Sequence, residues 1–412
     1  MTTVSTAHGL GGAEFVDGAH QRQLIGTTAV PVDPAVVPVH GPDGGQWLVT
    51  GYPETRDFLR DGRFSRAEAS EACHPRGPAL QMSITEMDPP RHTRIRNIIG
   101  GAFSARRVER LRPTIERIAE RLLHEAVRSG PVTDLIADFC APLTFTAHCE
   151  LLGVPAARRE SIGLSSLRRL GTPGAADPTE TYHAELLLHA EVTDLLADPD
   201  LPPGLLADLV AAHHDRGLLT DTELTGLAAS LFFDGHALAA AQIGNAVLCL
   251  LTRPALLASL RENPSLLDGV IEESFRYSPS VTLSMARVAT EDVTLGEACI
   301  RAGDRVTAAL PLANRDAAAF EHPQVFEPDR GANRHLSLGY GTHHCIGAHL
   351  ARVEVRAALG ALLRDDVHLE LAVPEEQLAW YASPTIRSLT ALPVHLSQRP
   401  RAPRTHDTGP GA

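Results

Sequence analysis

The chain of 412 residues contains no lysine, so all 37 of its cationic side chains are arginine. Aromatic residues make up only 4% of the sequence, and the six cysteines are scattered along it. Structural zinc sites and disulfide frameworks use closely spaced or patterned cysteines, which this sequence lacks. The scatter therefore favours reduced thiols and a cytoplasmic location.

Further absences exclude other classes of protein. The net charge of −13 argues against general nucleic-acid binding. The N-terminus lacks the charged-then-apolar pattern of a secretion signal. The longest apolar run, residues 224–251, approaches membrane-spanning length, but Asp234, His236, Gln242 and Asn245 interrupt it, which indicates a buried helix. We expect a soluble cytoplasmic monomer that binds neither nucleic acid nor membrane.

Helical patterns dominate the first three quarters of the chain, with no internal repeat and no linker. We expect a flexible arm at residues 1–18, a single domain at 19–398 and a disordered tail at 399–412. Helices are expected at about 53–60, 91–102, 105–129, 132–151, 158–170, 179–196, 205–216 and 221–251, with two more within 254–277. Strands are expected at 46–50, 293–295, 299–301, 305–307 and 388–396, and a long loop at Ser65–Glu86. The fold class is mainly α (α+β), a large helical body with small late β-sheets.

One segment carries most of the chemical information. Residues 335–347 read HLSLGYGTHHCIG and run directly into a helical stretch at 348–359. Cys345 follows two glycines and precedes a third, and the unpaired amides and dipole at a helix start favour a thiolate. A stabilised thiolate on a glycine loop suits an axial haem-iron ligand. The alternative is a metal site formed by His343, His344, Cys345 and His349, although zinc usually requires paired ligand spacing.

This segment resembles the haem-binding loop of a bacterial, actinobacterial-type cytochrome P450, and the resemblance extends over about residues 20–398. It implies a cytochrome P450 fold and haem b ligated by the Cys345 thiolate, which makes Cys345 the metal ligand. It also implies cofactor contacts by the loop glycines Gly339, Gly341 and Gly347, and propionate contacts by His92, Arg96, Arg287 and His335. Glu273, Arg276 and Arg330 would form a buried structural network.

Residues 231–243, LFFDGHALAAAQI, resemble the distal helix of the family but depart from its pattern. The family shows Ala-Gly-x-(Asp/Glu)-Thr, whereas this chain has Asp234 at the alanine, Ala237 at the acid and Leu238 at the threonine. In typical members the acid–alcohol pair organises water and delivers protons for oxygen activation. Alanine and leucine side chains donate no proton. The candidate catalytic residues of this helix are Asp234, Gly235, His236 and Leu238.

Three explanations of this departure remain open. A substrate group or trapped water replaces the threonine, or Asp234 or His236 supplies protons. In the third explanation the reaction is a radical coupling, cyclisation or desaturation, or one that uses another oxidant. Leu338 also stands where the family usually has phenylalanine.

The resemblance outlines a substrate pocket, and its apolar residues suit an apolar ligand body. The pocket residues are Met82, Ile84, Phe232, Leu283, Met285 and Thr385. We expect O2-dependent hydroxylation, epoxidation or oxidative cyclisation or coupling of a natural-product intermediate of peptide, polyketide or aromatic origin, free or carrier-bound. The alternative is a haem-binding sensor or scaffold that has lost oxygen activation.

The sequence shows no GxGxxG unit and no cysteine cluster that would indicate a fused reductase. The resemblance therefore implies separate electron donors, a ferredoxin and a ferredoxin reductase. A group of arginines on the otherwise acidic chain is the candidate docking patch for an acidic partner. Its members are Arg91, Arg94, Arg106, Arg107 and Arg110.

Overall fold

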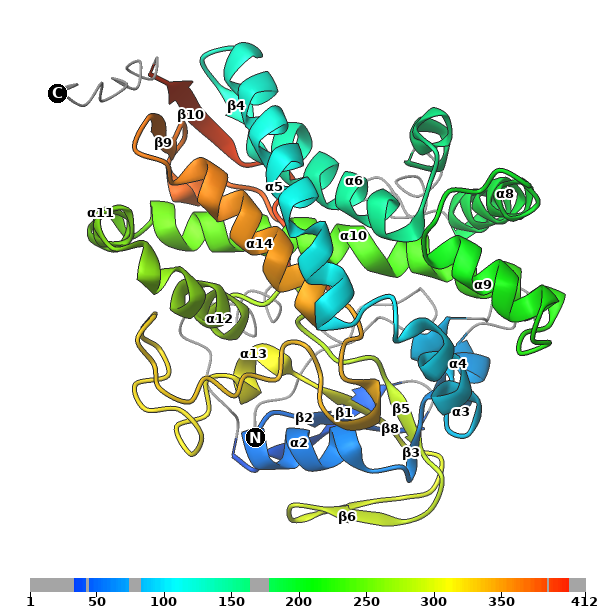
Figure 1. Cartoon of the computed structure of the whole chain (residues 1–412). Helices are drawn as coiled ribbons and strands as arrows, with labels where there is room; N and C mark the ends of the chain where they lie inside the picture. The colour runs from blue at the N-terminus through cyan, green and yellow to red at the C-terminus, as the bar shows by residue number, and fades with distance from the viewer. Residues whose placement is uncertain (1–32, 42–43, 74–82, 164–177, 384, 400–412) are drawn as a thin grey trace, which may run out of the picture.

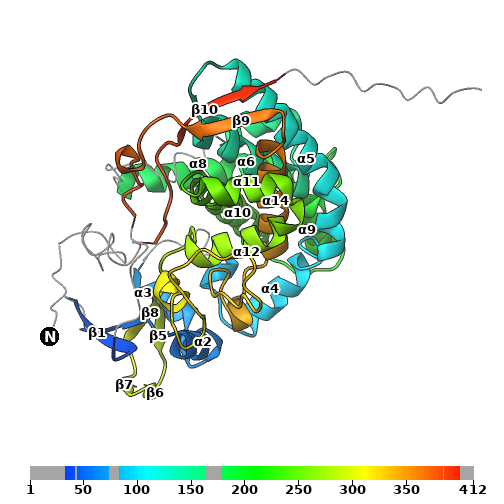
Figure 2. The same ribbon diagram turned by 90° about the vertical axis from the view of Figure 1, so that its left-hand side faces the viewer.

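The computed structural model describes residues 33–41, 44–73, 83–163, 178–383 and 385–399. The arm expected at residues 1–18 and nearly all of the tail expected at 399–412 lie outside these ranges. A large group of helices packs beside a smaller part that contains most of the strands, as Figures 1 and 2 show. This layout is the predicted mainly α body with small sheets.

Most of the predicted helices are present, with shifts of a few residues at their ends. The helices are α2 (Tyr52–Arg60), α3 (Arg66–Cys73), α4 (Arg91–Ile99), α5 (Ala105–Arg128), α6 (Ala141–Leu152), α8 (Pro178–Leu196), α9 (Leu205–His214), α10 (Asp221–Leu251), α11 (Pro254–Glu262), α12 (Leu267–Tyr277), α13 (Leu310–Ala313) and α14 (Ala348–Leu362). A π-helical segment, Ile136–Cys140, leads directly into α6.

The long loop expected at Ser65–Glu86 is wrong in its first part, where α3 forms. The hydroxyl of Ser65 accepts a hydrogen bond from the amide of Glu68 at 3.0 Å. The carboxylate of Asp88 accepts bonds from the amides of Arg66 and Ala67 at 3.0 and 3.2 Å. These bonds satisfy amides that a helix start leaves unpaired. Because one cap comes from a residue about twenty positions away, periodicity alone does not reveal this helix.

The main sheet joins early and late parts of the chain. Its strand order is β1 (Val36–Gly41), β2 (Gly44–Val49), β8 (Arg305–Ala308), β5 (Arg287–Ala289) and β3 (Phe64–Ser65). Strands β2 and β8 are parallel, with Gln46 opposite Arg305. A second sheet has the order β4 (Thr133–Asp134), β10 (Pro393–Gln398) and β9 (Val367–Leu371), and β6 (Val293–Leu295) pairs with β7 (Ala298–Ile300). Strands do cluster late in the sequence as expected, but they pair with the early strands β1 to β4 in the two larger sheets.

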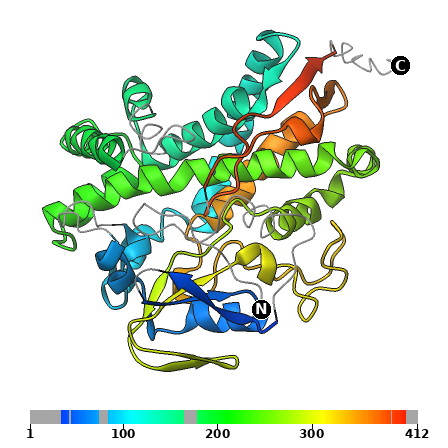
Figure 3. The same cartoon turned by 180° about the vertical axis from the view of Figure 1, so that it is seen from behind.

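Helix α10 is the longest described helix and crosses the helical part from one side to the other, which Figure 3 shows from behind. Thr220 and Glu223 form a capping box at its start, with the Glu223 amide 3.1 Å from the Thr220 hydroxyl. Of the described helices, it is the one that is long and apolar enough to cross a membrane, but 69% of its most apolar window is buried in the protein. Burial of that kind is typical of a core helix.

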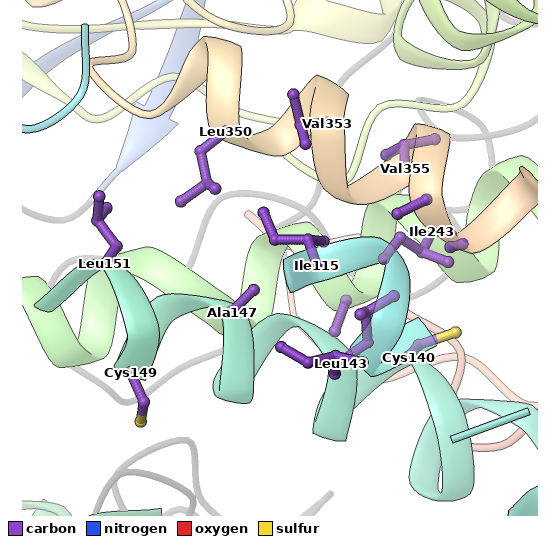
Figure 4. Close-up of a cluster of buried hydrophobic side chains, with 14 of the residues drawn as sticks. Ile115, Cys140, Leu143, Ala147, Cys149, Leu151, Ile243, Leu350, Val353 and Val355 are labelled. Carbon is purple, nitrogen blue, oxygen red and sulfur yellow. The ribbon is translucent and has the colours of Figure 1, made fainter. Parts of the chain in front are cut away.

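The core lies where α5, α6, α10 and α14 meet. Figure 4 shows side chains from all four helices in this space, with Ile115 of α5 between Leu143 and Ala147 of α6 and Leu350 of α14. Removing this apolar surface from water contributes about 25 cal/mol per Å². The packing fixes α14, and hence the cysteine loop that precedes it, against α10.

Candidate cofactor site

The loop ahead of α14 is built around Cys345. The amide of Cys345 donates to the carbonyl of Leu338 at 2.8 Å, which closes the loop on itself. Gly339 and Gly341 have φ values of +74° and +72°, a left-handed conformation that disfavours side chains. At Gly341 an added Cβ would also lie 2.9 Å from the Cα of Arg60 in α2. The glycines are thus required by the backbone and by the close approach of α2.

The loop leaves the cysteine accessible at the start of a helix. Cys345 is exposed, and its carbonyl accepts from the amide of Ala348 at 3.3 Å. A Cβ at Gly347 would stand 3.9 Å from the sulfur, so this position makes an ordinary contact with it. The Nη2 of Arg96 donates to the carbonyl of His344 at 2.6 Å, which attaches α4 to the loop.

Nitrogen-bearing side chains gather beside the loop, with His92 and Arg287 buried and His343 partly exposed. The rings of His92 on α4 and His343 on the loop lie 4.2 Å apart between centroids. Arg287, the first residue of β5, is buried with its guanidinium 5.3 Å from the Phe58 ring. Burial, followed by the charges of His92 and Arg287, lowers the pKa of His343 to about 3. Burial also lowers the pKa of Arg287 to about 10. The cluster is electrostatically suited to an anion, because an anion would offset these costs.

His335 contacts residues of α12. Its Nε2 lies 3.3 Å from the carboxylate of Glu272, and its ring stacks on Phe275 with centroids 5.6 Å apart. Arg352 of α14 binds the same carboxylate through two nitrogens at 2.6 and 2.9 Å. His343, considered in the sequence analysis only as a ligand of the alternative metal site, lies beside His92, and the propionate contact of His335 stays a prediction.

The metal-site alternative finds no support in the geometry. His349 bonds Glu109 at 2.9 Å, whereas His343 packs on His92. Among the described residues no group of three or more His, Cys, Asp or Glu side chains could hold a metal ion.

Glu273 and Arg276 form a fully buried ion pair on α12. Nε and Nη2 of Arg276 donate to the two carboxylate oxygens at 2.8 and 2.7 Å. Arg330 and Asn333 also donate to this carboxylate, at 3.3 and 3.0 Å in their closest contacts. Nη1 of Arg276 donates to the backbone carbonyls of Asn314 and Pro323, and Nη2 donates also to the carbonyl of Val325. The network ties α12 to the segment that leads into the cysteine loop.

On α10, the residues at the expected distal position divide between two faces. His236 is almost fully buried, and its ring meets Phe145 of α6 edge to face at 5.3 Å. Burial, followed by the charge of His148, lowers its pKa to about 3. Gly235 and Leu238 are partly exposed. The side chain of Asp234 lies outside the described residues.

The six residues predicted for the substrate pocket are not gathered in one place. Met82 lies outside the described residues, and Ile84 and Phe232 belong to the helical core. Leu283 packs with Ala309 and Leu312 in a small separate cluster, while 53% of Met285 is exposed. The carbonyl of Thr385 accepts from the amide of Thr282 at 2.9 Å, which places Thr385 beside the segment that carries Leu283.

An accessible cysteine on a glycine loop suits an axial haem ligand, because a cysteine thiolate is one of the groups that hold haem iron. The fit to a haem rests on unsatisfied donors. Nδ1 of His92 and Nε of Arg287 are buried and have no hydrogen-bond partner among the described residues. Such groups call for a partner, and a haem propionate has the required charge and oxygen atoms.

The comparisons with known proteins agree: the chain belongs to the cytochrome P450 family. The sequence profile of this family, described as Cytochrome P450, matches residues 198–377. The mycinamicin IV hydroxylase/epoxidase of Micromonospora griseorubida is 38% identical over 84% of this chain and 89% of the relative. The nocardicin C N-oxygenase of Nocardia uniformis subsp. tsuyamanensis is 39% identical over the same shares of the two chains.

A solved structure shows the same fold. The cytochrome P450 enzyme CxnD, described for C–S bond formation in chuangxinmycin biosynthesis, superposes with a TM-score of 0.81. It is 34% identical, and the match covers 89% of this chain and 92% of CxnD. The cofactor of the family is haem b with a cysteine thiolate ligand, so the resemblance found in the sequence is confirmed, together with the fold and cofactor that it implied.

Proposed function

We propose that this protein oxidises a natural-product intermediate, using O2 and electrons from a separate ferredoxin and ferredoxin reductase. The observation that carries the proposal is the accessible Cys345 on its glycine loop beside the buried His92 and Arg287 and the partly exposed His343. Two relatives bear names that describe oxidation of mycinamicin IV and nocardicin C, which supports the substrate class. The bound haem would supply oxygen binding and electron transfer.

In this proposal Cys345 is the axial ligand, and His92, Arg287 and His343 hold the propionates. We propose His343 in place of His335, because His335 already has a carboxylate partner in Glu272. Arg96 would support the loop through the His344 carbonyl and reach toward the same anionic groups.

The spectrum of the reduced protein with carbon monoxide tests this assignment. We expect the thiolate-type shifted Soret band in the wild type and its loss in Cys345→Ala. His343→Ala should lose haem faster to an apo-globin that competes for it. His335→Ala should lose less haem than His343→Ala in the same assay. Equal haem loss from the two variants would contradict the proposal that His343, rather than His335, binds a propionate.

The proton supply on the distal side is the second part of the proposal. His236 is neutral at pH 7, because burial lowers its pKa to about 3, and its ring is turned toward α6. We therefore favour a polar group of the substrate, or a water molecule that it orders, as the replacement for the missing acid–alcohol pair. Asp234→Asn tests the remaining side-chain candidate. An unchanged yield of product per NAD(P)H in this variant would support proton delivery through the substrate or its water. A loss of product with formation of hydrogen peroxide would instead assign proton delivery to Asp234.

The proposed reaction types are hydroxylation, epoxidation and oxidative coupling or cyclisation. The structural neighbour CxnD, described for C–S bond formation, supports including the last of these. Incorporation of labelled oxygen separates them, since coupling and cyclisation leave no O2-derived atom in the product. The alternative function, a haem-binding sensor or scaffold, predicts no product at all when NAD(P)H and the redox partners are supplied with substrate.

The arginine patch supports an acidic redox partner, but with fewer members than the sequence indicated. Arg91 and Arg94 pair with Glu223, and Arg107 pairs with Asp208. Arg106 and Arg110 are exposed at the start of α5 and line a shallow hollow with Arg216. We expect added salt to slow reduction by the ferredoxin and Arg106→Glu with Arg110→Glu to slow it further. Reduction that does not depend on salt would remove the electrostatic role.

A further inference from the structure

A buried histidine holds the distal helix from the side that faces α6. His148 lies in α6 and is almost fully buried. Its Nε2 is 2.8 Å from the carbonyl of Leu231 in α10. Its ring lies edge to face with Phe232, with centroids 6.4 Å apart. His148 thus presents one polar nitrogen to the backbone of α10 within otherwise apolar packing.

The protonation state follows from these contacts. Burial lowers the pKa of His148 to about 4, although the bond to Leu231 acts in the opposite direction. The imidazole is therefore neutral at pH 7, and since a carbonyl only accepts, Nε2 carries the proton and donates it to the carbonyl. Nδ1 has no hydrogen-bond partner among the described residues. One hydrogen bond, from Nε2 to the Leu231 carbonyl, is thus the interaction that offsets the cost of burying this polar ring.

The His148 ring occupies the space that a side chain at position 235 would need, so this position fits glycine. An added Cβ at Gly235 would overlap the imidazole of His148. The carbonyl of Leu231 is also the one that the amide of Gly235 reaches in a regular helix, four residues on. Insertion of a side-chain donor at such a carbonyl is a recognised cause of helix bending. His148 therefore acts on the turn of α10 from Leu231 to Gly235, which directly precedes the turn that carries Leu238.

The stretch of α10 that follows His236 has little polar support of its own. Residues 237–241 read ALAAA, so they offer no side chain that could bond the backbone. Polar contacts resume at Gln242, whose Oε1 accepts from the Ser280 amide at 2.9 Å, and at Asn245, which donates to the Arg387 carbonyl at 3.0 Å. The apolar stretch is held at its late end by these amides and at its early end by His148.

We propose that His148 is a positioning residue: its Nε2–H bond to the Leu231 carbonyl, seated in the space left by Gly235, sets the place of the distal helix where the acid–alcohol pair is missing. This inference rests on the proposed function only in taking α10 as the distal wall. The bond itself belongs to the protein and is open to measurement without turnover.

The test compares two neutral replacements in the haem-loaded protein. The Nε2–H of glutamine reaches as far as that of histidine, so His148→Gln keeps the donor, and His148→Leu removes it while filling the space. Hydrogen exchange of the α10 peptide that covers residues 231–238 is the primary measurement. We expect faster exchange in the leucine variant and near wild-type exchange in the glutamine variant. Product per NAD(P)H should fall ~10-fold or more in the leucine variant alone, since small displacements of reacting groups are costly.

Several outcomes would overturn the proposal. Wild-type exchange in both variants would show that the bond does not hold the helix, and equal acceleration in both would show that ring shape, not the donor, matters. If the leucine variant does not fold, the 15N–1H spectrum of the wild-type histidine decides, because an Nδ1–H tautomer is incompatible with the bond. The carbon monoxide spectrum is recorded for every variant, so that loss of thiolate ligation is distinguished from loss of helix position.

A steric test is independent of the donor. Gly235→Ala should accelerate exchange of the same peptide, because its methyl group meets the His148 ring. In a protein that also carries His148→Ala, the ring is gone, and the alanine at 235 should then add no further acceleration. Additive effects of the two substitutions would refute the contact.

Discussion

Substitution of Glu273 by glutamine is expected to destabilise the protein strongly. The carboxylate accepts hydrogen bonds from Arg276, Arg330, Asn333 and the backbone amide of Glu327, all between 2.7 and 3.5 Å. Glutamine retains the shape, but it removes the negative charge and turns an NH2 group toward donors. Arg276 then remains fully buried without a counter-charge.

The magnitude follows from that burial. Removing one partner of a buried ion pair costs about 3–5 kcal/mol, a large share of the roughly 5–15 kcal/mol that stabilises a folded domain. With an unfolding entropy of about 2 cal/mol/K per residue, a chain of this length should lose about 4–6 °C of melting temperature.

Urea unfolding followed by circular dichroism, at constant haem saturation, measures the change. Glu327→Gln serves as the matched control, because this neighbouring glutamate contributes a half-exposed side chain to the same Arg330. We expect the control to change the free energy of unfolding by less than about 1 kcal/mol. A loss below about 1 kcal/mol in Glu273→Gln would refute the reasoning, since it would mean that the arginine charges are solvated.

Three smaller perturbations test other parts of the structure. Hydrogen bonds from Arg352 and His335 outweigh burial and lower the pKa of Glu272 to about 2, so its stabilisation is present above about pH 4.5 and is lost as the pH falls toward 2. Glu272→Gln should therefore cost about 1–2 kcal/mol at pH 7, after discounting for a side chain that is about one-third exposed, and the difference in urea midpoints should vanish in acid. Gly341→Ala should cost about 1–3 kcal/mol and release haem faster in a globin-transfer assay, because φ is +72° and the methyl would crowd α2. Thr220→Ala removes the capping bond of α10 and should lower the unfolding free energy by about 1 kcal/mol, whereas Thr220→Ser should not.

The features that could be predicted from the sequence are local ones. The Cys345 loop is a contiguous segment, so its glycines and the helix after it are visible in the order of residues. The ion pair of Glu273 and Arg276 is likewise visible, because three residues separate them on one helix. Their full burial is not visible, since the backbone carbonyls that surround Arg276 come from residues 314–325.

Features that depend on contacts between distant elements escaped prediction. His335 and His343 lie in the same segment, and nothing in their spacing shows which one the loop turns toward His92. His148 gives no signal either, because a histidine within an apolar helix is ordinary until α6 is seen to pack on Gly235. A glycine within the apolar part of α10 was the one available indication that another residue approaches closely there.

The parallel pairing of β2 with β8 has a consequence for how the protein is made. Trp47 of β2 bonds Asp304, just ahead of β8, across 257 positions of sequence. At a synthesis rate of about 5–20 residues per second, β2 emerges from the ribosome roughly 13–50 s before its partner. During this interval β1 and β2 form an isolated hairpin, which is marginally stable in water. This early hairpin is thus among the last parts of the main sheet to become stable, and a chaperone that shields the edge of β2 would act before β8 has been synthesised.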